Sequence, residues 1–283
     1  MSEPIIAFLG TGSMNGSIMS GLLAGGTDPK RVRATTRSVE SARKLEESLP
    51  EDQRAVAIYS GEDSDSANLD AVENADVVLL GVKPKGILDL AAEIKDALKD
   101  EALVISVAAG IDLSMLEGQL RDGQPVIRSM PNTPSRVGRG VIALAPGTHC
   151  TAEQLNLAHD VLKNSGTVID VEEDQIDAVT GVSGSGPAYA FFLAEAMQKA
   201  GESMGLDAET ARLLAKETVS GAGELLHADD ADPEALRKAV CSPNGTTERA
   251  IDVFADGGLI ELTEKAAKAS AHRNAEMVEE FRR

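Results

Sequence analysis

A short apolar run followed at once by a glycine-rich turn opens the chain and limits what it can fold into. Residues 5–9 (Ile-Ile-Ala-Phe-Leu) read as a strand buried on both faces, and Gly10 and Gly12 follow directly. Residues 13–24 then offer a helix whose first N–H groups point back at the turn, a geometry that suits a diphosphate. The fingerprint G-x-G-x-x-G is incomplete, because Asn15 occupies the place of the third glycine. Taken alone, such a turn can also bind nothing.

The alternation of apolar runs and helical segments continues to about residue 171. Strands are expected at 32–35, 55–59, 77–82, 103–107, 126–129, 141–145 and 168–171. Helices are expected at 13–24, 39–49 and 84–98, the last begun by a proline. Repeated β-α units of this kind predict a Rossmann-like, doubly wound parallel sheet with helices on both faces. This context favours nucleotide binding at the glycine turn.

Beyond residue 171 the chain becomes rich in Ala, Glu, Lys and Leu with helical spacing. We therefore predict two domains: an NAD(P)-binding Rossmann-like domain over 1–171, and an all-helical dimerisation and substrate-binding domain over 172–283. Apolar stripes around Ala196, Ala200 and Met204 are wider than one helix pair needs. Most such stripes are core, but a small helical domain has little interior, which favours a self-complementary dimer face.

Composition excludes several classes of function. The chain has 46 acidic and 27 basic residues, and its net charge of -19 argues against nucleic acid or an anionic membrane as partner. We find no signal peptide and no apolar run long enough to span a bilayer, so we expect a cytoplasmic protein. Cys150 and Cys241 are isolated, and neither a disulfide nor a metal site is expected. The acidic surface also raises the hypothesis of a salt-adapted protein, which a melting series in KCl would test.

The segment after the second expected strand bears on the choice of coenzyme. Sheets that bind NAD usually place Asp or Glu there, to accept hydrogen bonds from the adenosine ribose. This chain has Thr36, Arg37 and Ser38 instead. Hydroxyls and a guanidinium remove repulsion and supply donors for a 2′-phosphate. We therefore expect NADP, with NADPH preferred and NADH left open as a second coenzyme, although Arg37 could also be an ordinary solvated side chain.

Further coenzyme contacts are expected where other strands end. Val82, Lys83 and Pro84 follow a central apolar run, and the proline fixes the turn so that its backbone can pass close to the cofactor. Ala109, just after the next apolar run, belongs to the same predicted site. The glycine turn contributes Gly10, Thr11, Gly12, Ser13 and Met14. A second rigid loop, 130–134 (Met-Pro-Asn-Thr-Pro), either positions backbone groups or simply links the domains.

Two loops of the helical part have an unusual composition. Residues 183–189 (Ser-Gly-Ser-Gly-Pro-Ala-Tyr) and 242–247 (Ser-Pro-Asn-Gly-Thr-Thr) each open a helix. Hydroxyls and free N–H groups at a helix start can bind a carboxylate, although each loop could equally be no more than a helix cap. A general acid is not evident, because Tyr189 has Leu193 rather than lysine four residues on. A protonated imine needs no strong acid, which favours a cyclic imine over a ketone as substrate.

Taken together, these motifs resemble the Δ1-pyrroline-5-carboxylate reductase family over essentially the whole chain. The segments that carry the resemblance are 10–14, 76–84, 130–134, 182–189 and 242–247. The resemblance implies NAD(P)H-dependent reduction of 1-pyrroline-5-carboxylate to L-proline, the last step of proline biosynthesis, by hydride transfer to the ring C=N.

The same resemblance implies roles for residues in the 242–247 loop. Thr247 matches the threonine whose hydroxyl bonds the ring nitrogen. Ser242, Gly245 and Thr246 match the loop that holds the substrate carboxylate. Asn244 stands where the family more often has glycine, which is a departure from the family pattern in this loop.

The resemblance also extends to the adenosine site and to assembly. Asn68 falls eight residues before Asp76, as does a family asparagine near the adenosine ribose and its phosphate. The family is built on homodimers joined through the helical domains, and five dimers commonly form a decamer.

Three other functions are compatible with parts of this sequence. β-Hydroxyacid dehydrogenases share the two-domain plan, but they carry a lysine at the start of the long interdomain helix, which is absent here. A reductase of another cyclic imine carboxylate stays open, because one ring methylene is worth only about 1 to 3 kcal/mol in a pocket. A non-catalytic NADP-sensing module also stays open, although Thr247 and both hydroxyl loops count against it.

Overall fold

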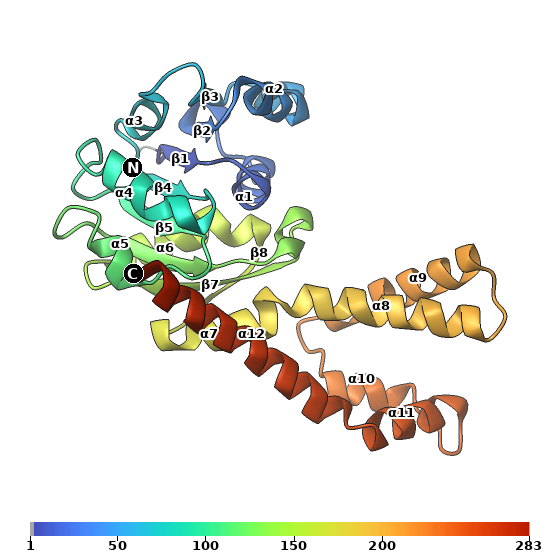
Figure 1. Ribbon diagram of the computed structural model, residues 1–283. Coiled ribbons are helices and arrows are strands. Elements are labelled where there is room, and N and C mark those ends of the chain that lie inside the picture. Colours follow the sequence, from blue (N-terminus) through green and yellow to red (C-terminus); the bar gives the residue numbers. More distant parts are fainter. Residues whose placement is uncertain (1–2, 283) are drawn as a thin grey trace. The chain divides into compact units, whose positions relative to one another are not determined.

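A single mixed sheet organises the first part of the molecule. The computed structural model describes residues 3–282 (Figure 1). The strands are β1 (Ile6–Leu9), β2 (Val32–Thr36), β3 (Ala57–Ser60), β4 (Val77–Leu80), β5 (Leu103–Ser106), β6 (Val126–Met130), β7 (Gly140–Pro146) and β8 (Gly166–Asp170). They lie in the order β3-β2-β1-β4-β5-β6-β7-β8, and neighbouring strands are parallel except β6 and β7. The predicted Rossmann-like sheet is confirmed.

The antiparallel pair β6–β7 departs from the expected all-parallel sheet. Parallel neighbours need a crossover of a dozen or more residues, usually through a helix. Here the chain turns back from β6 through one short 3₁₀ segment, Thr133–Val137, which ends at Gly138 with a φ of 68°. That left-handed conformation suits glycine, and it sends β7 back alongside β6.

Helices cover the sheet, and those expected over 13–24 and 39–49 are found. The helices of this part of the chain are α1 (Ser13–Ala24), α2 (Val39–Ser48), α3 (Ala67–Val72), α4 (Ile87–Ile94), α5 (Leu113–Glu117), α6 (Ala152–Leu162) and α7 (Ile176–Val179). The helix expected over 84–98 is shorter, because Pro84–Gly86 forms a 3₁₀ turn before α4 begins. None of the helices within residues 3–282 is both long and apolar enough to cross a membrane.

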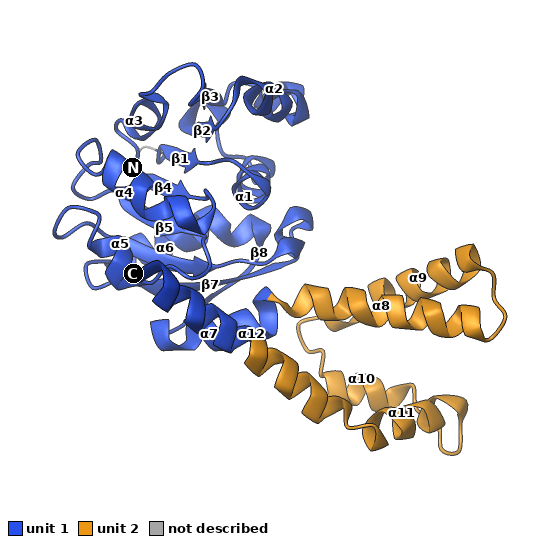
Figure 2. Ribbon diagram, viewed as in Figure 1, with its two compact units in different colours: residues 1–184, 270–283 blue, residues 185–269 orange. Residues whose placement is uncertain are grey.

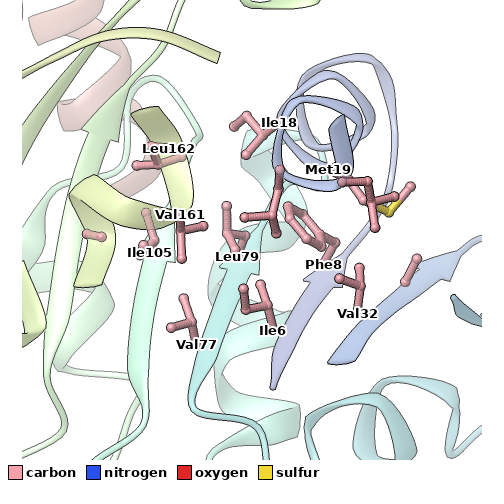
Figure 3. Close-up of a cluster of buried hydrophobic side chains, with 14 of the residues drawn as sticks. Ile6, Phe8, Ile18, Met19, Val32, Val77, Leu79, Ile105, Val161 and Leu162 are labelled. Atoms are coloured by element: carbon pink, nitrogen blue, oxygen red, sulfur yellow. The ribbon is translucent and has the colours of Figure 1, made fainter. Parts of the chain in front are cut away.

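The core lies on both faces of the sheet because side chains alternate along each strand. Ile6 and Phe8 of β1 join Val77 and Leu79 of β4 beneath helix α1 (Figure 3). The intervening residues of the same strands, among them Ala7 and Leu80, point into a second cluster on the other face. Burial on two faces explains why these strands are continuous apolar runs in the sequence.

The chain divides into two compact units, residues 1–184 with 270–283 and residues 185–269 (Figure 2). Helices of the second unit are α8 (Gly186–Ser203), α9 (Ala208–Leu226), α10 (Pro233–Ala239), α11 (Thr246–Asp256) and the first part of α12 (Leu259–Arg282). The end of α12 belongs to the first unit. The all-helical character expected of this part of the chain is confirmed, while the functional boundary at residue 171 stays a prediction.

Within the second unit, α8 and α9 pack closely on each other. A Cβ on Gly201 of α8 would lie 3.2 Å from the Cβ of Ala211 of α9, so small residues meet where the helices touch. Few side chains of this unit are buried, and many large apolar ones are exposed. Phe191 and Phe192 are 67% and 69% exposed, and Ile260 is 81% exposed. The unit therefore presents apolar surface far beyond what its own packing covers.

Candidate active site

The glycine turn lies where the strand order reverses. β1 has β2 on one side and β4 on the other, and ligands of open α/β sheets bind outside the strand ends at such a point. Gly10 has a φ of 71°, and a Cβ there would lie 2.4 Å from Cγ1 of Val82 and 2.9 Å from its backbone N. Only glycine fits at this position, because it allows both the left-handed backbone and the close approach of the β4 loop.

Hydrogen bonds fix the turn to the end of β2. The backbone N of Gly10 donates to Oγ1 of Thr35 at 3.0 Å, and the backbone N of Thr11 donates to the Thr35 carbonyl at 2.7 Å. The hydroxyl of Thr11 donates to the Phe8 carbonyl. Gly12 is the N-cap residue of α1 and provides no side-chain cap, so the helix start stays available to an acceptor from outside.

Ser13 and Met14 are the first two residues of α1, with the Ser13 side chain exposed and the Met14 side chain packed against the core. A cavity of about 320 Å³ opens beside them, lined in part by Gly12, Ser13 and Arg136. Arg136 follows the Met130–Pro134 loop in sequence, and no local pattern marks it as a neighbour of the turn.

Asn15 explains the missing third glycine. Its side chain is fully buried, and Nδ2 donates to the carbonyls of Leu9 at 3.1 Å and Leu79 at 3.2 Å. The amide therefore ties the carboxyl end of β1 to that of β4. A Cβ on Gly81 would lie 2.3 Å from the Asn15 amide, so glycine at 81 makes room for this bridge.

Three of the predicted cofactor segments meet at one edge of the sheet. β1, β4 and β5 are adjacent and parallel, so Gly10, Val82 and Ala109, which follow them, leave from the same edge. Lys83 is exposed and precedes the 3₁₀ turn that Pro84 begins. The structure thus places these segments at the carboxyl ends of β1, β4 and β5. We call the region outside the carboxyl ends of β1 and β4 the β1–β4 crevice, after the general rule for ligand sites of open α/β sheets.

The segment after β2 forms the start of helix α2. Oγ1 of Thr36 donates to the Ser38 carbonyl at 3.1 Å, and Oγ of Ser38 caps the helix by accepting from the backbone N of Ser41. Arg37 is exposed, and within residues 3–282 no ion pair engages it. Asn68 lies on α3, where its amide donates to the carboxylate of Glu93 at 3.1 Å. That contact joins the Asn68 amide to α4.

The predicted substrate residues lie in the second unit, at the start of α11. Thr246 and Thr247 are its first two residues, and Gly245 is an N-cap residue without a capping side chain. Asn244 has a φ of 58°, a left-handed conformation that asparagine tolerates better than most residues. Its backbone N donates to Oε2 of Glu248 at 2.7 Å, while the N of Gly245 donates to the carbonyl of the exposed Ser242. The Asn244 N–H is therefore occupied.

The Met130–Pro134 loop is anchored through one amide. Asn132 is buried, its Nδ2 donates to the Ser183 carbonyl at 2.9 Å, and its Oδ1 accepts from the backbone N of Val141 at 2.9 Å. Ser183 lies in a single π-helical turn, Thr180–Gly184, just before α8. Turns of this kind are frequent at functional sites. The loop thus joins β6, β7 and the segment that leads into the helical unit.

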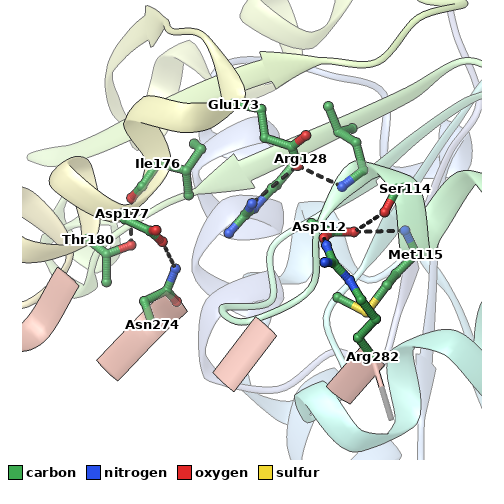
Figure 4. Close-up of polar contacts among 11 residues, drawn as sticks. Asp112, Ser114, Met115, Arg128, Glu173, Ile176, Asp177, Thr180, Asn274 and Arg282 are labelled. Atoms are coloured by element: carbon green, nitrogen blue, oxygen red, sulfur yellow. Dashed lines mark hydrogen bonds and ion pairs between the residues drawn. The ribbon is translucent and has the colours of Figure 1, made fainter. Parts of the chain in front are cut away.

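A polar cluster in the first unit holds the end of α12 (Figure 4). The carboxylate of Asp112 accepts from the backbone N of Met115 and the hydroxyl of Ser114, both at 2.8 Å, and pairs with Arg282. Burial raises the pKa of Asp112, but these contacts outweigh it and hold the pKa below its usual range. Nδ2 of Asn274 donates to Asp177 at 2.7 Å. The cluster fixes the last turns of α12 and has no part in the predicted site.

Comparisons with known proteins find family models for two parts of the chain and relatives over nearly all of it. A family model described as pyrroline-5-carboxylate reductase dimerisation matches residues 173–277, and one described as NADP oxidoreductase coenzyme F420-dependent matches residues 5–110. A pyrroline-5-carboxylate reductase of Pseudomonas aeruginosa is 40% identical, over 99% of this chain and 99% of that protein. That of Corynebacterium melassecola is 38% identical, over 96% of this chain and 98% of that protein.

Solved structures give the same answer. A pyrroline-5-carboxylate reductase from Coxiella burnetii superimposes with a TM-score of 0.88 at 39% identity, covering 98% of this chain and 99% of that one. The Plasmodium falciparum pyrroline carboxylate reductase, solved with NADP bound, shares the fold with a TM-score of 0.80 at 22% identity, over 98% of this chain and 99% of that one. This chain therefore belongs to the pyrroline-5-carboxylate reductase family.

Proposed function

We propose that the β1–β4 crevice holds NADP(H) and that the start of α11 holds the substrate while 1-pyrroline-5-carboxylate is reduced to L-proline. The reaction follows from membership of the family. The observation that best supports this assignment of the crevice is Gly12: a Cβ there would meet no atom within 4 Å, so open space adjoins the uncapped start of α1. An uncapped helix start with open space beside it can accept a diphosphate.

Each part of the crevice has a distinct task. The N–H groups of Ser13 and Met14 would hold the diphosphate, and the loop beginning at Val82 would pass along the ribose and nicotinamide. Arg37 would pair with the 2′-phosphate, which supports a preference for NADPH over NADH. When bound, the coenzyme supplies the hydride.

The helical unit supplies the polar groups that orient the imine. The hydroxyl of Thr247 would form a hydrogen bond with the ring nitrogen and would donate the proton that this nitrogen carries in proline. The carboxylate would be bound by Ser242, by the N–H group of Thr246 and by the positive end of the α11 dipole. The N–H of Gly245 already donates to the Ser242 carbonyl. Asn244 cannot contribute its N–H while Glu248 accepts from it.

The chain carries a dimerisation domain, matched over residues 173–277. Exposed apolar side chains on the helices of the second unit, such as Phe191, Phe192 and Ile260, support a homodimer formed through these helices. A decamer of five dimers is the assembly we propose beyond the dimer.

We propose the cytoplasm as the compartment of this protein, supported by the two free cysteines, Cys150 and Cys241.

Oxidation of NADPH and NADH by the purified protein with 1-pyrroline-5-carboxylate, in low and in molar KCl, tests the assignment. We expect saturable turnover that yields proline, with a lower KM for NADPH. If NADPH binds but no turnover occurs at any salt concentration, the assigned reaction is wrong.

A further inference from the structure

We propose that Glu62 limits the preference for NADPH over NADH. Its carboxylate accepts a hydrogen bond from the first backbone N–H of α2, and it places a negative charge at the adenosine end of the coenzyme site. This inference rests on the proposed function of the β1–β4 crevice. It assigns to Glu62 a role in coenzyme specificity: a ribose 2′-hydroxyl is accepted beside it, and a 2′-phosphate is repelled.

Hydrogen bonds join the loop after β3, which contains Gly61 and Glu62, to the segment from Thr36 to Val39 that would contact the adenosine ribose. The backbone N of Gly61 donates to the Thr36 carbonyl at 3.0 Å, and the backbone N of Glu62 donates to Oγ of Ser60 at 3.2 Å. These bonds bring Glu62 to the start of α2, where its Oε2 accepts from the backbone N of Val39 at 3.0 Å. Two of the first three N–H groups of α2 are therefore occupied, that of Val39 by Glu62 and that of Ser41 by the Ser38 cap.

The position of this carboxylate matters because of what the neighbouring strand lacks. Dinucleotide sites of this type place Asp or Glu at the end of the second strand, where it accepts from the ribose 2′-hydroxyl. Here that position carries Thr36, Arg37 and Ser38, and the carboxylate comes instead from the loop after β3. Glu62 can thus accept from the 2′-hydroxyl of NADH as an acid at the end of β2 would.

The same carboxylate opposes NADPH. A phosphate monoester carries between about one and a half and two negative charges at neutral pH, so it is repelled by a nearby carboxylate. It is also denied the Val39 N–H, a favourable donor at a helix start, while Glu62 occupies that donor. Arg37 attracts the phosphate and Glu62 repels it, so the net coenzyme preference reflects both side chains.

Glu62→Gln is the informative variant, because the glutamine amide oxygen can still accept from Val39 while the charge is lost. We would measure kcat/KM for NADPH and NADH in the complete protein. Because the carboxylate is exposed, we expect about a three- to tenfold gain with NADPH and a loss of up to about fivefold with NADH, whose 2′-hydroxyl loses a charged acceptor. The gain should shrink in molar KCl, because salt screens the repulsion. Glu47→Gln, which removes a charge from the far end of α2, is the control and should leave the ratio unchanged.

Calorimetry with adenosine 2′,5′-bisphosphate and with 5′-AMP keeps the test independent of catalysis. Tighter binding of the bisphosphate alone to the Glu62→Gln protein would support the role of Glu62 even if the substrate proved to be another imine. An unchanged ratio of the two affinities, or an equal shift in the control variant, would overturn it. Failure of wild-type protein to bind either nucleotide would instead reject the coenzyme site itself.

Discussion

Replacing each glycine of the turn by alanine should affect a different property: Gly10→Ala should lower the stability of the fold, and Gly12→Ala should lower the affinity for NADPH. In Gly10→Ala the alanine must adopt the left-handed backbone conformation of Gly10, which costs about 1 to 2 kcal/mol. It must also displace Val82, whose Cγ1 would lie 2.4 Å away, and such overpacking costs about 1 to 3 kcal/mol. The free energy of unfolding should therefore fall by about 2 to 5 kcal/mol, which for a unit of this size lowers Tm by roughly 4 to 20 °C.

Gly12→Ala is the matched control, because Gly12 has a φ of −87° and open space around its Cβ position. Its Tm should stay within about 3 °C of wild type. The methyl group would stand between the start of α1 and the diphosphate, and loss of charge-assisted hydrogen bonds there should weaken NADPH binding roughly ten- to hundredfold. Thermal unfolding without ligand and calorimetry with NADPH measure the two effects. Wild-type affinity in Gly12→Ala, or wild-type Tm in Gly10→Ala, would refute the reasoning.

Three further changes test the site and the scaffold. Thr247→Ala should lower kcat about tenfold to a thousandfold with NADPH affinity retained, the scale of losing one positioned proton donor, and unchanged turnover would reject its role. Arg37→Ala should raise the KM for NADPH far more than that for NADH, and equal losses in steady-state kinetics would contradict a contact with the 2′-phosphate. Burial raises the pKa of Asp76, but hydrogen bonds from Lys99 and from the backbone N of Ile5 outweigh it and lower the pKa below the usual 3.8. Its stabilising effect is therefore present above that value and lost as the pH falls through the lowered pKa, so the Tm deficit of Asp76→Asn at pH 7 should shrink by pH 3.

The sheet could be predicted from sequence because its strands are buried on both faces. Continuous apolar runs marked β1, β4 and β5, and the bounds of α1 matched the expected 13–24. The direction of β7 could not be predicted, since a run such as 141–145 looks the same in either orientation. The short turn that ends at Gly138 reverses the chain, and β7 is antiparallel because it then pairs with β6, the strand just before the turn. The single-turn helix α5 escaped prediction because five residues show no period.

Parts of the site were hidden for a different reason, because their roles come from contacts between distant segments. Asn15 reads in sequence as a defect in the fingerprint, yet its amide reaches the Leu79 carbonyl, 64 residues away. Glu62 stands in an acidic loop with Asp63 and Asp65, and nothing in the sequence distinguishes the three. The fold selects Glu62 by bringing it to the N–H of Val39.

Arg37 and Glu62 together make a stricter test of the coenzyme site than either does alone. No ion pair joins them within residues 3–282, so each should act on the 2′-phosphate independently. Their effects on NADPH affinity have opposite signs, and independent effects add within about 0.3 to 0.5 kcal/mol. In the double variant Arg37→Ala with Glu62→Gln, the change in the free energy of NADPH binding should then equal the sum of the two single changes. NADH affinity should fall by the same small factor in both proteins that carry Glu62→Gln and stay near wild type in Arg37→Ala. A larger coupling would mean that the two side chains pair with each other in solution, and the loss in Arg37→Ala would then report a freed carboxylate instead of a missing phosphate contact.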